Sequence, residues 1–297
     1  MLCYKRKAFA NTIYPWPEQM CFLAWVSTTK RKTGMSKTIQ EVIDLIVARI
    51  PGAPLVDSVD TIKCGDAKRE ITGIVTTFTA SMDVLKQAVA RNANFIITHE
   101  PTFYEHRDNT AWLGDDPVYT AKRAFIEEHN LTIWRFHDYW HMHEPDGIQV
   151  GVEKALDWEG FEHTDNRYVV HIPPTTVSGL IGELKQKLSR PTLRVVGDLN
   201  MPCERVGMLL GAIGGQNQIK ALHMADLDVV LCGETVEWQA CEYVRDAIAT
   251  GHNKALIILG HATSEEAGMH YLIEWLQPQL EDIAMHFIPA GDPILVV

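Results

Sequence analysis

The chain has 297 residues, 46% of them hydrophobic, so it is long enough to bury the cores of two α/β lobes. Its formal net charge of −11 argues against broad binding to nucleic acid or anionic lipid, because neutralising phosphates requires a basic surface. No stretch approaches the roughly 18 to 20 consecutive apolar residues that a membrane span requires. We therefore expect a cytoplasmic protein with no nucleic-acid or membrane partner.

The first 34 residues differ in charge from the rest of the chain. They hold six Lys or Arg residues and a single acidic residue, Glu18. Their apolar run at 20–26 is too short and too badly placed to be the hydrophobic region of a signal peptide. We expect residues 1–34 to be a poorly ordered extension, the alternative being a basic tail or targeting peptide. A sequence typical of a domain start follows at Met35.

Helices and strands are expected to alternate through the first half of the chain. Apolar residues recur at helical spacing from Ile39 to Ile50, behind the candidate N-caps Ser36 and Thr38 and ahead of Pro51. β-Branched and apolar runs then predict strands, with amphipathic helices between them. The expected elements are a strand at 71–78, a helix at 81–92, a strand at 95–98, a helix at 116–129 and a strand at 131–136.

The second half shows the same alternation after Pro173-Pro174, a pair that we interpret as a seam between two lobes. The expected elements are helices at 176–188, 216–224, 236–250 and 264–276, and strands at 192–196, 205–210, 228–232, 254–259 and 283–288. We predict an α/β protein of two lobes, 35–172 and 173–297, with mostly parallel or mixed sheets. Segment 254–297 is expected to complete a metal site in the cleft between the lobes, at the carboxyl ends of strands.

Pairs of potential metal ligands follow two of these predicted strands. His261 and Glu265 stand four residues apart at a strand-to-helix junction, so both side chains share one face of the helix. His99 and Glu100 are adjacent after another strand, where neighbouring side chains diverge, which suits two metals better than one. Each pair also has an ordinary interpretation, because a His before a helix is often a cap or core residue and Glu100 could simply face water.

A third cluster is the run 135–143, Arg-Phe-His-Asp-Tyr-Trp-His-Met-His, directly after a buried strand. His137, Asp138, His141 and His143 are all candidate ligands, and not all of them can bind. A mixture of imidazole and carboxylate suits Zn, Mn, Fe or Ni rather than Ca or Mg, which prefer oxygen ligands. Together, the three clusters predict a site for two divalent metal ions.

Other catalytic motifs are not matched. The turn 211–215, Gly-Ala-Ile-Gly-Gly, lacks the Lys-Ser/Thr of a P-loop and the spacing of a dinucleotide fingerprint. We interpret it as a tight turn, with phosphate binding at the start of the next helix as the alternative. The sequence has no Gly-x-Ser-x-Gly nucleophile elbow, which argues against a serine hydrolase triad.

Two segments resemble the Ngg-interacting-factor-three-like family, dinuclear-metal proteins often named GTP cyclohydrolase type 2. Segment 96–103, Ile-Ile-Thr-His-Glu-Pro-Thr-Phe, is similar to the family's His-His-Pro loop. Segment 260–265, Gly-His-Ala-Thr-Ser-Glu, is similar to its closing His-x-x-x-Glu motif. The similarity covers about residues 35–297, and it implies a two-lobed α/β fold and a ring-shaped homo-oligomer, a hexamer.

The resemblance also implies a ligand set. The family has His-His in its first loop, where this chain has His99 and Glu100. Its second loop has a His followed four residues later by an Asp, where this chain has His137 and His141. The two departures are reciprocal and preserve three imidazoles and two carboxylates, which favours His141 over His143. The implied metal ligands are His99, Glu100, His141, His261 and Glu265.

The remaining residues of the second loop, His137 and Asp138, are expected to orient a ligand or to move protons, although Asp138 could itself replace a ligand. The resemblance implies a metal-dependent hydrolase of a nucleotide or related heterocycle, in which two metal ions polarise the bond being attacked. The alternative is a non-catalytic metal-binding or regulatory interaction protein. It stays open because no base-recognition motif or basic phosphate clamp accompanies the ligands.

Overall fold

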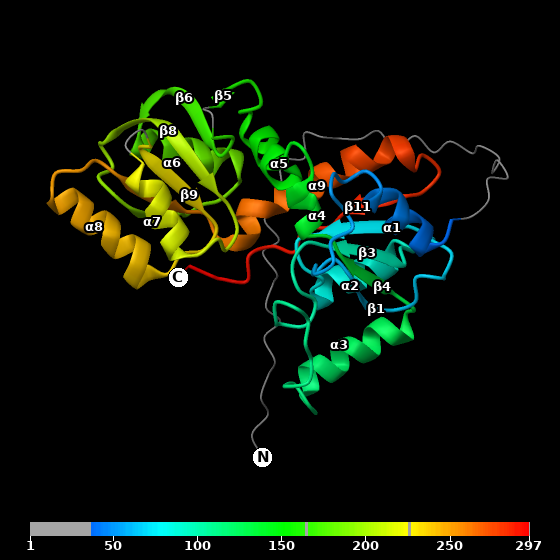
Figure 1. The fold of residues 1–297 in the computed structure, drawn as a ribbon. Coiled ribbons are helices and arrows are strands. Elements are labelled where there is room, and N and C mark those ends of the chain that lie inside the picture. Colours follow the sequence, from blue (N-terminus) through cyan, green and yellow to red (C-terminus); the bar gives the residue numbers. More distant parts are fainter. Residues whose placement is uncertain (1–36, 164–165, 225–226, 297) are drawn as a thin grey trace, which may run out of the picture. The chain divides into compact units, whose positions relative to one another are not determined.

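The computed structural model of the chain describes residues 37–163, 166–224 and 227–296, which form two β-sheets with accompanying helices (Figure 1). The predicted extension at residues 1–34 lies outside the described residues. None of the helices in the described part of the chain has the length and apolar character needed to cross a membrane.

The first sheet holds the strands whose ends carry two of the ligand clusters. Strands β2, β3, β4 and β11 run parallel, and β1 pairs with β4 in the antiparallel direction. Helices α1 (Ile39–Val47), α2 (Met82–Ala90) and α3 (Pro117–Glu128) begin at the N-caps Thr38, Ser81 and Asp116. The strand order is β1 (Ile62–Cys64), β4 (Thr132–Arg135), β3 (Phe95–Thr98), β2 (Ile74–Thr77) and β11 (Met285–Phe287).

The second sheet is mixed. Strands β8, β9 and β10 run parallel, whereas β5, β6 and β7 add antiparallel pairings at its two edges. The prediction of an α/β protein with mostly parallel or mixed sheets is therefore confirmed. The strand order is β5 (Glu162–His163), β6 (Val169–Thr176), β8 (Pro202–Leu209), β9 (Val229–Cys232), β10 (Ala255–Ile258) and β7 (Arg194–Val196), and the helices are α6 (Val177–Lys187), α7 (Gly215–His223), a π-helical turn (Glu237–Cys241) and α8 (Glu242–Ala249).

Helix α9 (His261–Leu276) links the two sheets (Figure 1). It begins directly after β10 of the second sheet, and its body packs on the first sheet, where Thr76 Oγ1 donates a hydrogen bond of 2.8 Å to the Met269 carbonyl. Helix α5 (Gly147–Leu156) crosses α9 so closely that a Cβ atom on Gly151 would lie 2.4 Å from the Ala267 carbonyl. The backbones of α5 and α9 are therefore in direct contact at Gly151 and Ala267.

Several of the described elements were not predicted from the sequence. They are β1, α4 (Asp138–Met142), α5, β5 and β6. Strand β6 runs through Pro173-Pro174, and its pairing with β8 shifts register between His171 and Thr175, which accommodates two residues that cannot donate to the ladder. The pair that we interpreted as a seam thus lies inside a strand. The division into lobes at 35–172 and 173–297 stays a prediction.

Candidate metal centre

Six side chains from three strand ends meet in one cluster. His99 and Glu100 follow β3, and His137 and His141 lie at the start and in the body of α4, directly after β4. Ligand atoms of His99, His137 and His141 all lie within 4.8 Å of one another, as do those of His99, Glu100 and Glu265. His261 joins through its Nε2 atom, 3.1 Å from Glu265 Oε2 and 3.6 Å from Glu100 Oε1.

The centre of the cluster contains two buried polar atoms that form no hydrogen bond within the described residues, although one of them, Glu265 Oε2, is also in ion-pair distance of His261 Nε2. His99 is fully buried, and its Nδ1 atom lies 3.3 Å from the Phe136 carbonyl. Its Nε2 atom lies 3.5 Å from Glu265 Oε2. Neither of these two buried atoms has a hydrogen-bond partner among the described residues. Because a buried polar atom without a partner is costly, a nitrogen and a carboxylate oxygen facing each other in this way fit a divalent cation between them.

The other three imidazoles are each held by a carboxylate at Nδ1, which leaves Nε2 as the atom available to a metal. This second layer of acids fixes the tautomer and the orientation of a metal-binding imidazole. Asp146 and Glu234 had not been singled out from the sequence. The pairs are His137 with Asp138 at 2.9 Å, His141 with Asp146 at 3.0 Å, and His261 with Glu234 at 2.9 Å.

Buried Arg135 holds the loop that carries the first two ligands. Its guanidinium is fully buried and donates from Nε to the His99 carbonyl at 2.9 Å and from Nη1 to the His106 carbonyl. Its Nη2 atom lies 3.4 Å from Glu100 Oε2. One side chain at the end of β4 therefore fixes the backbone and a carboxylate of the loop after β3.

Asp60 performs a similar role for helix α4. Its Oδ1 atom accepts the amide protons of His137 and Asp138 at 2.8 and 3.0 Å, and its Oδ2 atom accepts that of Tyr139 at 2.7 Å. Burial raises the pKa of Asp60 to about 6, although the three amide hydrogen bonds act to lower it. The helix that carries His141 is thus capped by a buried carboxylate from a distant loop.

Glycines bring the first turn of α9 close to the second sheet. Gly260 precedes the helix with φ at +94°, and Gly211 has φ at +67°. A Cβ atom on Gly211 would lie 2.1 Å from Glu265 Oε1. The turn 211–215 therefore packs directly against the carboxylate of the cluster, and only a glycine fits at its first position.

Burial and neighbouring charges shift the pKa values of the histidines in the cluster in different directions. Burial, reinforced by His137 and His141, holds the pKa of His99 well below its ordinary value. Burial, with the neighbouring His141, also lowers the pKa of His137 to about 4. Burial acts to lower the pKa of His261 too, but the carboxylates of Glu265 and Glu100 raise it to about 9. His99 and His137 are therefore neutral at pH 7, whereas His261 would lose its proton when a metal binds.

The structure separates the candidates of the run 135–143. His137 and His141 lie in the cluster, with their ring centroids 5.0 Å apart. His143 lies elsewhere: its Nδ1 atom is 2.7 Å from the Pro145 carbonyl, and its ring packs against Trp275. Asp138 contacts His137 rather than the centre of the cluster.

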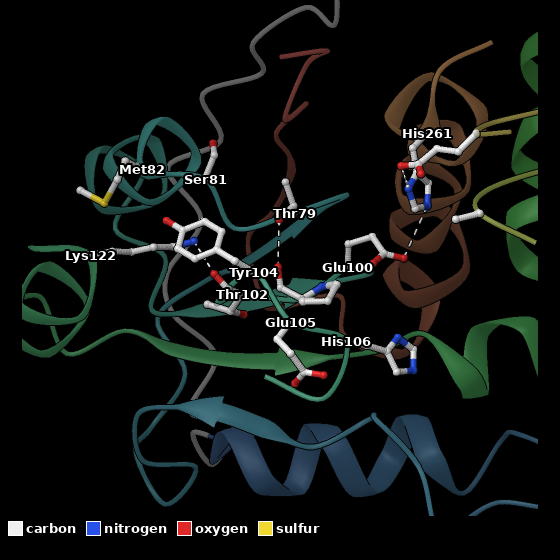
Figure 2. Close-up of a pocket in the computed structure, with 13 residues that line it drawn as sticks. Thr79, Ser81, Met82, Glu100, Thr102, Tyr104, Glu105, His106, Lys122 and His261 are labelled. Atoms are coloured by element: carbon white, nitrogen blue, oxygen red, sulfur yellow. Dashed lines mark hydrogen bonds and ion pairs between the residues drawn. The ribbon is translucent and has the colours of Figure 1, made fainter. Parts of the chain in front are cut away.

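A cavity of about 730 Å³ opens beside the cluster (Figure 2). Glu100 and His261 form the part of its wall that belongs to the cluster, and Figure 2 shows Glu100 reaching toward His261. Other walls come from the loop after β3 and from Lys122 of α3. Its size lies within the range of about 300–1,000 Å³ that is common for small-molecule sites.

A second cavity of about 450 Å³ reaches the cluster from another direction. His141 and Asp146 contribute to its wall, and apolar side chains such as Met208 and Leu210 line much of the rest. Lys220 of α7 also lines it. Two cavities therefore border the cluster, one with several charged side chains in its wall and one lined largely by apolar side chains.

Curated relatives are similar in sequence over most of their length. A Clostridium acetobutylicum protein named GTP cyclohydrolase 1 type 2 homolog is 23% identical over 247 residues, which cover 78% of this chain and 84% of the relative. A Vibrio cholerae protein of the same name is 25% identical over 239 residues, covering 77% and 88% of the two chains.

Solved structures show the same fold. A Bacillus cereus protein related to NIF3 superposes with a TM-score of 0.71 at 14% identity, covering 89% of this chain and 100% of that one. Reduced HcgD from Methanocaldococcus jannaschii superposes with a TM-score of 0.59 at 18% identity, covering 85% and 98%. The family model of Duf34/NIF3 (NGG1p interacting factor 3) matches residues 38–293. Since that match spans most of the chain, the protein belongs to the Duf34/NIF3 family, as the motifs around His99 and His261 had indicated.

Proposed function

We propose that the chain is a hydrolase that depends on two divalent metal ions and acts on a nucleotide or a related heterocycle. The observation that carries the proposal is the facing pair of buried atoms, His99 Nε2 and Glu265 Oε2, which have no hydrogen-bond partner within the described residues. The proposed ligands are His99, Glu100, His141, His261 and Glu265, and the proposed metals are Zn, Mn, Fe or Ni.

The geometry favours a ligand role for His137 as well. Its Nδ1 atom is held by Asp138, and its Nε2 atom lies 3.7 Å from Glu100 Oε1. Its ring stacks on that of His99 with the centroids 4.6 Å apart. Asp138 then acts on His137 as Asp146 acts on His141, by holding the ring. From the sequence we had expected both residues to orient a ligand or to move protons, with Asp138 as a possible replacement ligand. Metal content after His137→Ala tests the ligand role.

When bound, two metal ions would activate water and polarise the bond being attacked. The residues of the chain provide the rest. Carboxylates hold the imidazole rings in one orientation, and Arg135 holds Glu100. If His137 is not a ligand, it would instead exchange protons with Asp138, which also accepts a hydrogen bond of 2.9 Å from Ser58 Oγ.

The nucleotide substrate is supported by the names of the relatives and by the size of the larger cavity. The curated relatives carry the name GTP cyclohydrolase 1 type 2 homolog. The cavity of about 730 Å³ has room for a nucleotide directly beside Glu100 and His261.

Turnover of metal-loaded protein tests the proposal. Purified chain loaded with Zn, Mn, Fe or Ni would be assayed against purine nucleotides and simple phosphoesters. Loss of turnover is expected in His261→Ala and Glu265→Gln, whereas His143→Ala, which removes a histidine outside the cluster, should retain it. Metal-loaded protein that binds nucleotides but turns over none of these compounds would favour a non-catalytic metal-binding or regulatory protein instead.

The assembly and the location of the protein are separate proposals. A hexameric ring is what the family resemblance implies, and light scattering on the purified chain would measure it. A cytoplasmic location is proposed from the sequence alone, and fractionation of cells would test it.

A further inference from the structure

The wall of the larger cavity opposite the cluster contains a buried ammonium group. Lys122 of α3 is only 3% exposed, and its Nζ atom donates a hydrogen bond of 2.6 Å to the Thr102 carbonyl (Figure 2). The same atom lies 5.7 Å from the centre of the Phe103 ring and 5.3 Å from that of Tyr104. Within the described residues this is the one hydrogen bond found for the ammonium, which has three protons to donate.

Thr102 adds a hydroxyl group that has no hydrogen-bond partner within the described residues. Its side chain lines the cavity and is 1% exposed, and its Oγ1 atom has no hydrogen-bond partner among the residues that the structure describes. Leaving a buried hydroxyl unpaired costs stability unless something else pairs with it. An acceptor that enters the cavity would pair with this hydroxyl and with the ammonium of Lys122 together.

Helix α2 contributes a weaker positive field to the same cavity. Ser81 and Met82, at its N-terminus, line the wall. The Ser81 hydroxyl is already used, because it accepts the Val84 amide proton. The field of the nine-residue helix still favours a negative charge at this end.

The acidic side chains of the cavity already have partners. Glu100 lies 3.4 Å from Arg135, and Glu234 lies 2.9 Å from His261. Glu105 accepts amide protons from Arg107 and Asn109 at 3.0 and 2.9 Å. Their charges are therefore partly compensated before an anion enters.

The backbone of Tyr104 helps to explain why the ammonium lies where it does. Tyr104 has φ at +66°, an unusual value for a bulky residue, and its side chain is 55% exposed. This conformation places the ring over Lys122 at the mouth of the cavity (Figure 2). Strained residues of this kind are concentrated at functional sites.

We propose that Lys122 and Thr102 recognise an anionic oxygen of the substrate, a phosphate group of the nucleotide, while Glu100 and His261 at the other part of the same cavity hold the metals. The proposal rests on the proposed function for the choice of substrate. It supplies the phosphate clamp that no motif in the sequence indicated. Burial lowers the pKa of Lys122 to about 8, although Asp108 acts to raise it, so the ammonium stays mostly charged at pH 7.

Binding of GTP and guanosine to the full chain, loaded with zinc, tests this assignment. By calorimetry, Lys122→Met should weaken GTP binding about 10- to 100-fold, the usual effect of losing a hydrogen bond from a charged group. Guanosine, which lacks the phosphates, should bind the variant as it binds the wild type. Lys220→Met is the matched control, because it removes the same charge from the second cavity, and it should leave GTP binding unchanged.

Thr102→Val separates recognition from a structural role. If Thr102 and Lys122 only hold the loop after β3, replacing an unpaired hydroxyl by a methyl group should leave the melting temperature equal or higher and GTP binding unchanged. The proposal expects the same melting temperature but GTP binding weakened about 5- to 10-fold. This variant keeps the carbonyl that Lys122 contacts.

The outcomes distinguish this proposal from that of the hydrolase. Wild-type protein that binds neither GTP nor pyrophosphate, or GTP binding that survives Lys122→Met, would overturn the recognition role. Protein that binds GTP through Lys122 but never turns it over would leave the recognition role intact and remove the hydrolase.

Discussion

The two halves of the cluster are held in different ways. The half from the first sheet, His99, Glu100 and the histidines of α4, is supported by buried charged groups, Arg135 and Asp60. The half from α9 has one polar support, Glu234 on His261, and is also held by close packing at glycines. Polar supports specify orientation through hydrogen bonds, whereas glycine contacts specify position through excluded volume. The geometry of the cluster therefore depends both on hydrogen bonds that orient its side chains and on close packing that sets their positions.

The largest effect is expected from removing the buried charge of the first half. Arg135→Met would leave Glu100 and the His99 and His106 carbonyls without their donor. We expect the free energy of unfolding to fall by about 3 kcal/mol, as when one partner of a buried ion pair is lost. Urea unfolding measures it. Arg123→Met, which breaks an exposed pair with Glu127, should cost less than about 1 kcal/mol; equal losses in the two variants would contradict the comparison.

Substitution of a glycine tests the second half. In Gly211→Ala the new Cβ atom would lie 2.1 Å from Glu265 Oε1, so the carboxylate must move. We expect a loss of about 2 kcal/mol of stability together with weaker metal binding, measured by calorimetry with zinc. Gly114→Ala separates the two causes, because Gly114 also has a positive φ but has nothing within 4 Å of the new atom. If both variants bound metal like the wild type, the close packing would have no role in the site.

Removal of the carboxylate that caps α4 should lower the free energy of unfolding by a smaller amount, but it should also weaken metal binding. Asp60→Ala removes the acceptor of three amide protons at the helix that carries His141. Asp116→Ala removes the cap of α3, which carries none of the ligands. Each variant should lose about 1–2 kcal/mol of unfolding free energy. Only Asp60→Ala should release metal, and metal retention in that variant would show that the cap does not position the ligands.

The smallest expected effect is that of pH on GTP binding at Lys122, in the larger cavity. Because the pKa of Lys122 lies at about 8, below its ordinary value, the ammonium loses its proton as the pH rises through that value. GTP affinity should therefore fall up to about tenfold between pH 7 and pH 9. The charged group that faces Lys122 is Asp108, which also pairs with Lys63 at 3.4 Å. In Lys122→Arg the guanidinium stays charged, so an identical fall in this variant would assign the pH dependence to another group.

Much of the arrangement could be predicted because local sequence determines it. The apolar runs at β3, β4 and β10 are short and buried, and each is followed by polar residues of ligand type. Parallel strands place such residues at one edge of a sheet, so the candidates could be named before the fold was known. The helix starting at His261, with Glu265 one turn later, follows from the same local pattern.

The supporting residues could not be predicted because they act over long separations. Asp60 lies 77 residues before His137, and no periodic pattern connects them. Asp146 could have been recognised as an N-cap from the apolar residues at helical spacing that follow it. Its contact with His141 could not, because it depends on the tertiary fold. Arg135 carried one available signal, a charged residue at the end of an apolar strand.

Elemental analysis of the purified chain measures whether the cluster holds two metal ions. We expect about two equivalents of a transition metal in the wild type, about two in His143→Ala, and one or fewer in both His99→Ala and His261→Ala, since each half of the cluster is required. Wild-type protein without metal after incubation with zinc, manganese, iron or nickel, or undiminished metal in the two cluster variants, would contradict this expectation.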